Sequence, residues 1–486
     1  MIRFNRALIL GSVLLASMPA FAAESLSGCG KAAEKGYLNL AFFSLDRTIH
    51  ASAANANPAE FVNALGCLDQ VQERDALVDL PNYDSELARV APRAKSAEDQ
   101  ATLAHFAFRS ILQRLSNGAK SDQALAALRP LVKSSAFYDS ATTGLVAAAN
   151  ANYAVAKPAL RKAFALSGDA KSPFRAELKL ALARALYASG EDAAAVAEYE
   201  ALYKIGAPMQ DALIESGWAQ LRAKNYVKSI GLSYELATGK LSQFFAPEAN
   251  SIRAIGFVEN CRYSESRNAI ARFSTEYTPI SEWLKTTAKS GNSLYETAIA
   301  RSEGAVGAES VPEKVWSMWS TSDLFISLQT GIRAAFTEER DAVDFVADLS
   351  DVKAKAAAAA DLKKIAQLRA RAAERVEAHL AKLDASMVSR IETESERMRF
   401  VRVEANQGAG RDLVYRNANP GLNDVEKKVA KEDRKAKSYQ GKLDWGKVNA
   451  EDPAAEMWVD EIGNYEASSL DRCKAKAEYK KLQASR

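Results

Sequence analysis

Few residues in this sequence have the type and spacing that catalysis or metal binding needs. The three histidines, His50, His105 and His379, lie far apart in the sequence, and none has a second ligand at metal-binding spacing. The H-E-x-x-H, C-x-x-C and G-x-S-x-G patterns and the phosphate-binding P-loop do not occur in the 486 residues. Gly408 and Gly410 predict a flexible turn, because no strand precedes them and no third glycine completes a phosphate-binding loop. We therefore expect no metal, no cofactor and no enzymatic activity.

One enzyme class nevertheless places its catalytic part after a long helical region. Periplasmic lytic transglycosylases use a glutamate in a Glu-Ser context, followed by glycine-rich and glutamine-rich motifs. Glu309-Ser310 and Glu394-Ser395 supply the dipeptide here, but the motifs that should follow them are missing. A peptidoglycan-associated enzyme, or a regulator of one, is therefore kept as an alternative function.

The four cysteines fit an oxidising compartment. Cys29, Cys67, Cys261 and Cys473 allow three pairings. We favour Cys29–Cys67 and Cys261–Cys473, because the first pair is local and leaves the two distant cysteines for each other. On the chain-entropy model, loops of these lengths would stabilise the fold by about 4 and about 5 kcal/mol.

The first residues have the pattern of an export signal. Arg3 and Arg6 form a basic region, an apolar stretch of about a dozen residues follows, and Ala20-Phe21-Ala22 supplies an A-x-A cleavage motif. We expect residues 1–22 to be a cleaved signal peptide and the mature chain to act in the periplasm. The alternative is lipid anchoring through Cys29, because Leu26-Ser27-Gly28-Cys29 has the residue types of a lipobox.

The composition indicates an all-α protein that is nearly balanced in charge. Alanine is abundant, and the chain has only 13 prolines and 24 glycines. Without Arg3 and Arg6, the basic residues fall from 64 to 62 against 61 acidic ones, a net charge of +1. Such a balance gives no general attraction to nucleic acid or anionic lipid. No segment after the signal is long and apolar enough to predict a transmembrane span.

Residues 96–300 contain a repeated pattern. Its anchor positions are Asp192, Tyr226 and Tyr263, at spacings of 34 and 37 residues. A small residue follows each anchor by three positions, and a proline closes each copy. These pairs are Ala195 with Pro208, Ser229 with Pro247, and Ser266 with Pro279. Two weaker copies precede them, around Tyr153 and around Asp122.

This pattern resembles the tetratricopeptide (TPR) repeat, a helix–turn–helix unit of about 34 residues. That family has small residues where its two helices cross, an aromatic residue after the turn and a proline after the second helix. Asp192 departs from the aromatic, and the third copy is longer than the unit. The resemblance implies an α-solenoid, because a pair of amphipathic helices can bury its apolar face only against neighbouring copies.

The regions on either side of the repeats are also helical in pattern. Residues 23–95 form an N-terminal helical region, in which Asn57-Pro58 predicts a helix start. Pro81 and Pro92 bracket a looser linker, and Gly304 to Pro312 forms a second one.

The helical region over 311–404 contains one long charged helix, from Val352 to about Glu404, with a length of about 75 Å. Arg369 and Glu394 interrupt its apolar stripe. It is therefore either a coiled-coil arm or a helix that lies against the solenoid.

Residues 405–486 form the C-terminal region. We expect a turn-rich loop to about residue 424, a charged helix from Asp424 to Lys437 and a terminal helical cap. Trp458, Glu461 and Tyr465 are the candidate interface residues, because aromatic side chains dominate binding hot spots. The alternative is that this segment only caps the solenoid, with Cys473 tied to Cys261.

These features predict a TPR-like α-solenoid with a long C-terminal helical arm and a helical terminal cap. The expected function is that of a non-enzymatic exported scaffold, which mediates protein–protein interactions in a bacterial cell-envelope complex. The layout is similar to periplasmic TPR proteins of gliding and predatory bacteria, including components of adventurous gliding motility. That resemblance implies envelope proteins as partners, near peptidoglycan or the outer membrane. A lipid-anchored outer-membrane assembly factor is the third hypothesis.

Overall fold

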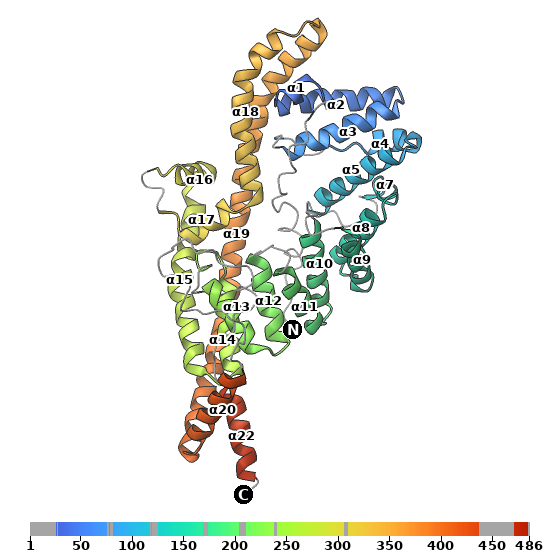
Figure 1. Cartoon of the computed structure of the whole chain (residues 1–486). Coiled ribbons are helices and arrows are strands. Elements are labelled where there is room, and N and C mark those ends of the chain that lie inside the picture. Colours follow the sequence, from blue (N-terminus) through green and yellow to red (C-terminus); the bar gives the residue numbers. More distant parts are fainter. Residues whose placement is uncertain are drawn as a thin grey trace. The chain divides into compact units, whose positions relative to one another are not determined.

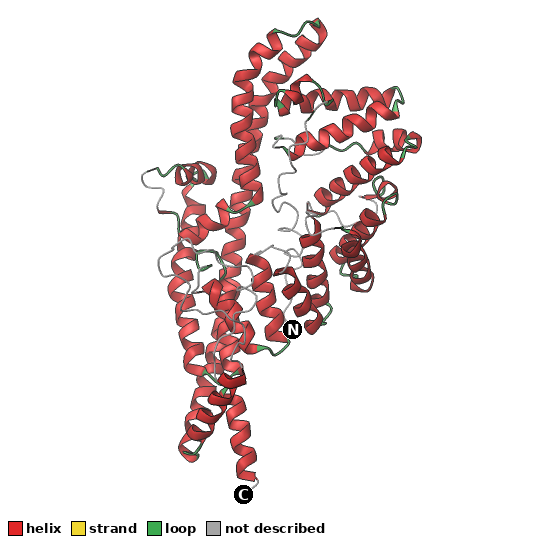
Figure 2. Cartoon of the chain, in the orientation of Figure 1, coloured by secondary structure: helices red, strands yellow, loops and turns green. Residues whose placement is uncertain are grey.

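The computed structural model describes Leu26 and residues 28–74, 77, 81–116, 118, 125–168, 174–203, 210–237, 241–305, 310–436 and 471–484. Every regular element in these ranges is a helix (Figure 2), which confirms the all-α class. In the same ranges, no helix combines the length and hydrophobicity that crossing a bilayer requires.

The helices form two compact units. Unit 1 contains the described residues of Met1–Ser189, Ser293–Ala305 and Trp319–Lys382. Unit 2 contains those of Gly190–Asn292, Val306–Met318 and Leu383–Arg486. The longest helix, α19 (Val352–Ala418), contributes residues to both units.

Unit 1 contains the helices of the N-terminal part of the chain and two helices that follow much later in the sequence. In chain order they are α1 (Lys31–Glu34), α2 (Leu38–Ala54), α3 (Pro58–Glu73), α4 (Asp84–Val90), the 3₁₀ helix η2 (Ala91–Arg93), α5 (Ala97–Ser116), α7 (Arg129–Val132), α8 (Ala136–Ala149), α9 (Tyr153–Leu166), α10 (Phe174–Ala188), α16 (Leu294–Ser302) and α18 (Asp323–Ala347).

Unit 2 contains the central helices, the second part of α19 and the C-terminal helices (Figure 1). In chain order they are α11 (Asp192–Tyr203), α12 (Gln210–Arg222), α13 (Tyr226–Ala237), α14 (Pro247–Glu259), α15 (Tyr263–Ser290), most of α17 (Glu313–Ser320), α20 (Leu422–Ala436) and α22 (Arg472–Ala484).

Four helical hairpins share one type of turn: α2–α3, α8–α9, α12–α13 and α14–α15. The residue two positions before each second helix is Ala56, Ala151, Lys224 or Cys261, and its φ is 51°, 57°, 64° or 55°. The N–H of the next residue donates to the carbonyl five residues earlier, as Asn225 does to Gln220 at 2.8 Å. This is the Schellman arrangement that ends a helix. The recurring anchors Tyr226 and Tyr263 are therefore the first residues of α13 and α15.

Small residues allow the helices of unit 2 to approach closely. Ser229 is fully buried, and its hydroxyl donates to the carbonyl of Gly217 on α12 at 2.9 Å. A Cβ atom on Gly256 would lie 2.7 Å from Cγ1 of Ile230, so α13 and α14 could not pack as they do around a larger residue. Ala195 and Ser266 are also fully buried. The small residues of the repeat pattern are thus core residues.

We expect Lys224→Gly to stabilise the protein by about 0.5–1 kcal/mol. A residue with a side chain at positive φ pays a steric penalty that glycine avoids, and Lys224 is exposed with a φ of 64°. Chemical denaturation of the variant measures the change. The matched control is Gly190→Ala: Gly190 has a φ of 84° and open space around it, so this change should cost about 1 kcal/mol through the backbone alone. A Lys224→Gly variant that is less stable than the wild type would contradict the left-handed turn.

Three expectations about helix ends are wrong. Pro279 does not end a helix, because α15 continues through it to Ser290. Pro247 does not close α13 but occupies the first position of α14, where the N–H that proline lacks is not needed. Residues 405–418 are not a loop, because α19 continues through Gly408 and Gly410 to Ala418. Pro208, the third of these prolines, lies outside the described residues.

The predictions for the N-terminal region are mixed. The helix start at Asn57-Pro58 is confirmed, since α3 begins at Pro58 and the Asn57 side chain accepts a hydrogen bond from the Glu60 N–H. The linker between Pro81 and Pro92 is instead largely helical, because α4 lies within it and Pro92 itself lies in η2.

The long charged helix exceeds its predicted length. α19 has 67 residues, or about 100 Å, and its apolar stripe is buried at Ile365, Val376, Leu380, Met387, Ile391 and Met398. Within unit 1, Arg369 of α19 pairs with Glu339 of α18 at 2.6 Å. This contact fits both predicted arrangements, a coiled-coil arm and a helix that lies against the solenoid.

Candidate functional site

In unit 2, one face of α19 carries charged residues at helical spacing. Arg390, Glu394 and Arg397 follow one another by four and three residues, so they lie on the same side of the helix. This side meets the first turn of α14 and the buried Trp218 of α12. The charges that interrupt the apolar stripe are therefore contact residues.

The closest polar contact of this face is a bidentate ion pair. Nε and Nη2 of Arg390 donate to Oε1 and Oε2 of Glu248 at 2.7 and 2.8 Å. The two side chains are 12% and 15% exposed, and the Arg390 guanidinium lies 5.0 Å from the centre of the Phe245 ring. Burial alone would raise the pKa of Glu248, but the Arg390 guanidinium outweighs it and holds this pKa below its usual value. The pair therefore stays charged at neutral pH.

A second contact lies one turn further along α19. Arg397 pairs with Glu394, and its guanidinium lies 4.6 Å from the centre of the Trp218 ring. Burial, and then the negative charge of Glu248, raise the pKa of Glu394 to about 7. An exposed pair, Lys285 of α15 with Glu392 of α19 at 2.8 Å, joins α15 to α19 at the surface.

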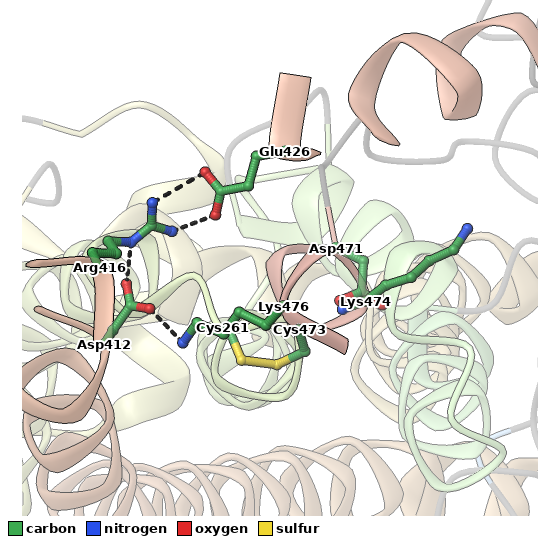
Figure 3. The surroundings of a disulfide bond; sticks show 8 residues. All are labelled: Cys261, Asp412, Arg416, Glu426, Asp471, Cys473, Lys474 and Lys476. Carbon is green, nitrogen blue, oxygen red and sulfur yellow. Dashed lines mark hydrogen bonds and ion pairs between the residues drawn. A yellow bond between two sulfur atoms is a disulfide. The ribbon is translucent and has the colours of Figure 1, made fainter. Parts of the chain in front are cut away.

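The C-terminal end of α19 is held by a group of contacts that we call the C-terminal clasp (Figure 3). It comprises the Cys261–Cys473 disulfide and the chain of ion pairs from Lys476 through Asp412 and Arg416 to Glu426. The N–H of Arg472 also donates to the carbonyl of Asn260 at 3.1 Å. The clasp therefore joins α22 to the turn between α14 and α15, and joins both to α19 and α20.

Close packing at the clasp explains one of the two glycines inside α19. A Cβ atom on Gly408 would lie 2.2 Å from Cε1 of Tyr263, whereas a Cβ on Gly410 would meet nothing within 4 Å. Gly408 is thus the point where the first residue of α15 rests against α19. The prediction of a loop here was wrong, because α19 continues through both glycines.

We expect opposite effects from alanine at these two glycines. Gly410→Ala should stabilise the protein by about 0.5–1 kcal/mol, because glycine is a poor helix former and the new methyl group meets no atom. Gly408→Ala should destabilise it by about 1–3 kcal/mol, because the Tyr263 ring must move. Thermal unfolding of both variants measures the difference. Equal shifts in melting temperature would contradict the contact with Tyr263.

In unit 1, carboxylates of the long helices cap the beginnings of other helices. Glu338 of α18 accepts hydrogen bonds from the N–H groups of Asn39 and Leu40, at 3.1 and 2.8 Å, at the start of α2. Glu377 of α19 accepts from the N–H groups of Leu294 and Tyr295, at 2.9 and 2.7 Å, at the start of α16. These caps satisfy N–H groups that a helix leaves unpaired and orient each helix against its neighbour.

The three histidines remain separate in the structure. His50 lies 3.1 Å from Glu86, His105 lies 2.8 Å from the Tyr138 hydroxyl, and Nε2 of His379 lies 2.6 Å from the Ser322 hydroxyl. No three His, Cys, Asp or Glu side chains of the described ranges are arranged to hold a metal ion.

Both predicted cysteine pairs are disulfides in the structure. The candidate interface residues Trp458, Glu461 and Tyr465 lie outside the described residues. Comparison with protein-family models, curated proteins and solved structures finds no match. The functional argument therefore depends on this chain's own residues.

Sequence reasoning missed the Glu248–Arg390 pair. The sequence contained two indications of this pair. One was the presence of charged residues inside the apolar stripe of α19, which we interpreted only as an irregular stripe. The other was Glu248, a carboxylate in the first helical turn after Pro247.

Proposed function

We propose that this chain is an exported, non-enzymatic scaffold of TPR-like helical hairpins that mediates protein–protein interactions in a bacterial cell envelope. The shared hairpin turn, the buried small residues and the 34- and 37-residue spacing support the TPR resemblance. Two disulfides support an oxidising compartment, in agreement with the export signal.

A second apolar face on α19 is the observation that carries this proposal. Met398, Val401 and Ala405 are buried on one side of the helix. Phe400 and Val403, on the other side, are 66% and 54% exposed. A soluble helix normally has one apolar face, so two apolar faces indicate two partners.

The exposed face has the spacing of a helix-binding stripe. Phe400, Val403, Gln407 and Val414 follow one another by three, four and seven residues, as in a heptad repeat, and Val414 is 71% exposed. We call these four residues the α19 stripe. Its proposed ligand is the apolar side of an amphipathic helix of an envelope protein.

Crosslinking and pull-down from the native envelope test the proposal. The wild-type chain should recover a reproducible protein partner, and Phe400→Glu with Val403→Glu should lose it. Val352→Glu is the matched control, because Val352 is 80% exposed on the same helix but outside the α19 stripe. Recovery of no reproducible partner, or equal loss with the control, would count against the proposal.

The two alternative functions have their own tests. Release of soluble muropeptides from purified sacculi by the protein would establish the peptidoglycan enzyme. Lipid anchoring needs the Cys29 sulfur, which the Cys29–Cys67 disulfide already uses. We therefore expect mass spectrometry to find a mature chain that begins at Ala23 and carries no diacylglycerol on Cys29.

A further inference from the structure

One buried carboxyl group is incompletely paired where α19 meets α14 in unit 2. The Glu394 side chain is only 4% exposed, and its Oε1 accepts a hydrogen bond from Arg397. Its Oε2 is buried and has no hydrogen-bond partner in the described ranges. The hydroxyl of Ser251 on α14 is buried as well, and it also lacks a partner there. Unpaired buried oxygens cost free energy, so this part of the contact is incomplete while Glu394 is ionised.

Among the described residues, the charged groups at this contact include more carboxylates than guanidinium groups. Arg390 donates to Glu248 from two nitrogens, which leaves Arg397 to pair with Glu394. Burial would lower the pKa of Arg390, but the negative charges of Glu248 and then of Asp211 on α12 raise it. Two guanidinium groups of α19 therefore meet three carboxylates, and one added proton would balance the cluster.

The other helices at this contact contribute aromatic side chains. The centre of the Trp218 ring of α12 lies 4.6 Å from the Arg397 guanidinium. Burial raises the pKa of Tyr277 on α15 well above its usual value, so this phenol is neutral beside the pair of Glu248 and Arg390. Neither aromatic side chain compensates the excess negative charge.

Glu394 is the member of the cluster that takes up the proton near neutral pH. Burial, and then the charge of Glu248, raise its pKa to about 7, and Arg397 and the nearby Ser251 hydroxyl offset these effects only in part. In the unfolded chain the same group has its ordinary pKa of about 4.5. The folded protein therefore binds one more proton than the unfolded chain between these two values, and its stability rises as the pH falls through this window.

We propose that protonation of Glu394 controls how tightly α19 packs against α14. A protonated Glu394 can donate from Oε2 to the Ser251 hydroxyl, which gives both buried oxygens a partner, and it no longer repels Glu248. An ionised Glu394 places a second buried negative charge beside Glu248. The contact is therefore tightest at acidic pH and loosens as the pH rises to about 7 and above.

This proton-sensitive contact does not depend on the proposed scaffold function, although that function would give it a use. Phe400, the first residue of the α19 stripe, follows Glu394 by six residues on the same helix. The pH around an exported chain would then affect how rigidly the α19 stripe is held; this consequence rests on the proposed function.

Denaturant unfolding of the full-length wild type and of Glu394→Gln between pH 5 and pH 8 tests the proposal. Glutamine has the shape of a protonated glutamic acid but does not titrate, so this variant should be more stable than the wild type at pH 8. The ratio of the wild-type to the variant folding equilibrium constant should rise about tenfold per pH unit as the pH falls from 7 to 5. Glu392→Gln is the matched control, because Glu392 lies on the same helix with its side chain 59% exposed, and its ratio should change less than about twofold.

Hydrogen exchange of the wild type provides a second measurement, which does not require a variant to fold. After correction for the intrinsic pH dependence of exchange, the amides of α14 should be more protected at pH 5 than at pH 8. Parallel pH profiles of the wild type and Glu394→Gln, an equal pH effect with Glu392→Gln, or unchanged protection of α14 would overturn the proposal. Failure of the pull-down with the α19 stripe would leave these results unchanged, so the two proposals are tested separately.

Discussion

Replacing both Cys261 and Cys473 with serine should lower the free energy of unfolding by about 5 kcal/mol in oxidising buffer. The disulfide joins residues 212 positions apart, and closing so long a loop removes much conformational entropy from the unfolded chain. Denaturant unfolding of the variant and of the wild type measures the difference.

The second disulfide provides the control for this experiment. Cys29 and Cys67 are only 38 residues apart, so the corresponding double serine variant should lose less, about 4 kcal/mol. Reduced wild type should be at least as unstable as either variant. If the variant without Cys261 and Cys473 melts at the same temperature as the wild type in oxidising buffer, the Cys261–Cys473 disulfide of the C-terminal clasp is not formed.

Arg390→Ala should destabilise the protein by about 3–5 kcal/mol. The change leaves the Glu248 carboxylate buried without its partner, and the cost of an uncompensated buried charge exceeds the value of the pair itself. Lys285→Ala removes a pair between α15 and the same long helix, but its side chains are 49% and 59% exposed, so the cost should be at most about 1 kcal/mol.

A double-mutant cycle makes the test of this pair sharper. Glu248→Gln and Arg390→Met together should cost much less than the sum of the single changes, because each single change leaves one buried charge unpaired, whereas the double variant leaves none. Additive effects, or equal effects of Arg390→Ala and Lys285→Ala, would contradict the buried contact between α14 and α19.

The sequence predicted those features that depend on local patterns. Its alanine content and apolar periodicity gave the helical class, and Tyr226 and Tyr263 marked the first residues of α13 and α15 correctly. A shared backbone turn produces that spacing, so the signal is local and can be read without tertiary information.

Features that depend on distant partners were not predictable in the same way. Gly408 indicated a loop, yet it lies inside a helix, and the contact that requires a glycine there comes from Tyr263, 145 residues earlier in the sequence. Pro279 indicated the end of a helix, yet α15 continues past it to Ser290. Arg369 and Glu394 suggested only an irregular apolar stripe, and the ion pair of Arg390 with Glu248 is visible only in the fold. A periodic pattern identifies a buried face, but it does not identify the partner.

Photocrosslinking from position 400 of the full-length chain, in its native envelope, tests the central claim most directly. A photoreactive amino acid in place of Phe400 should yield a discrete crosslinked protein, and the same probe in place of Val352 should not. No crosslinked protein from position 400, or the same products from both positions, would contradict a protein-binding scaffold that presents the outer face of α19.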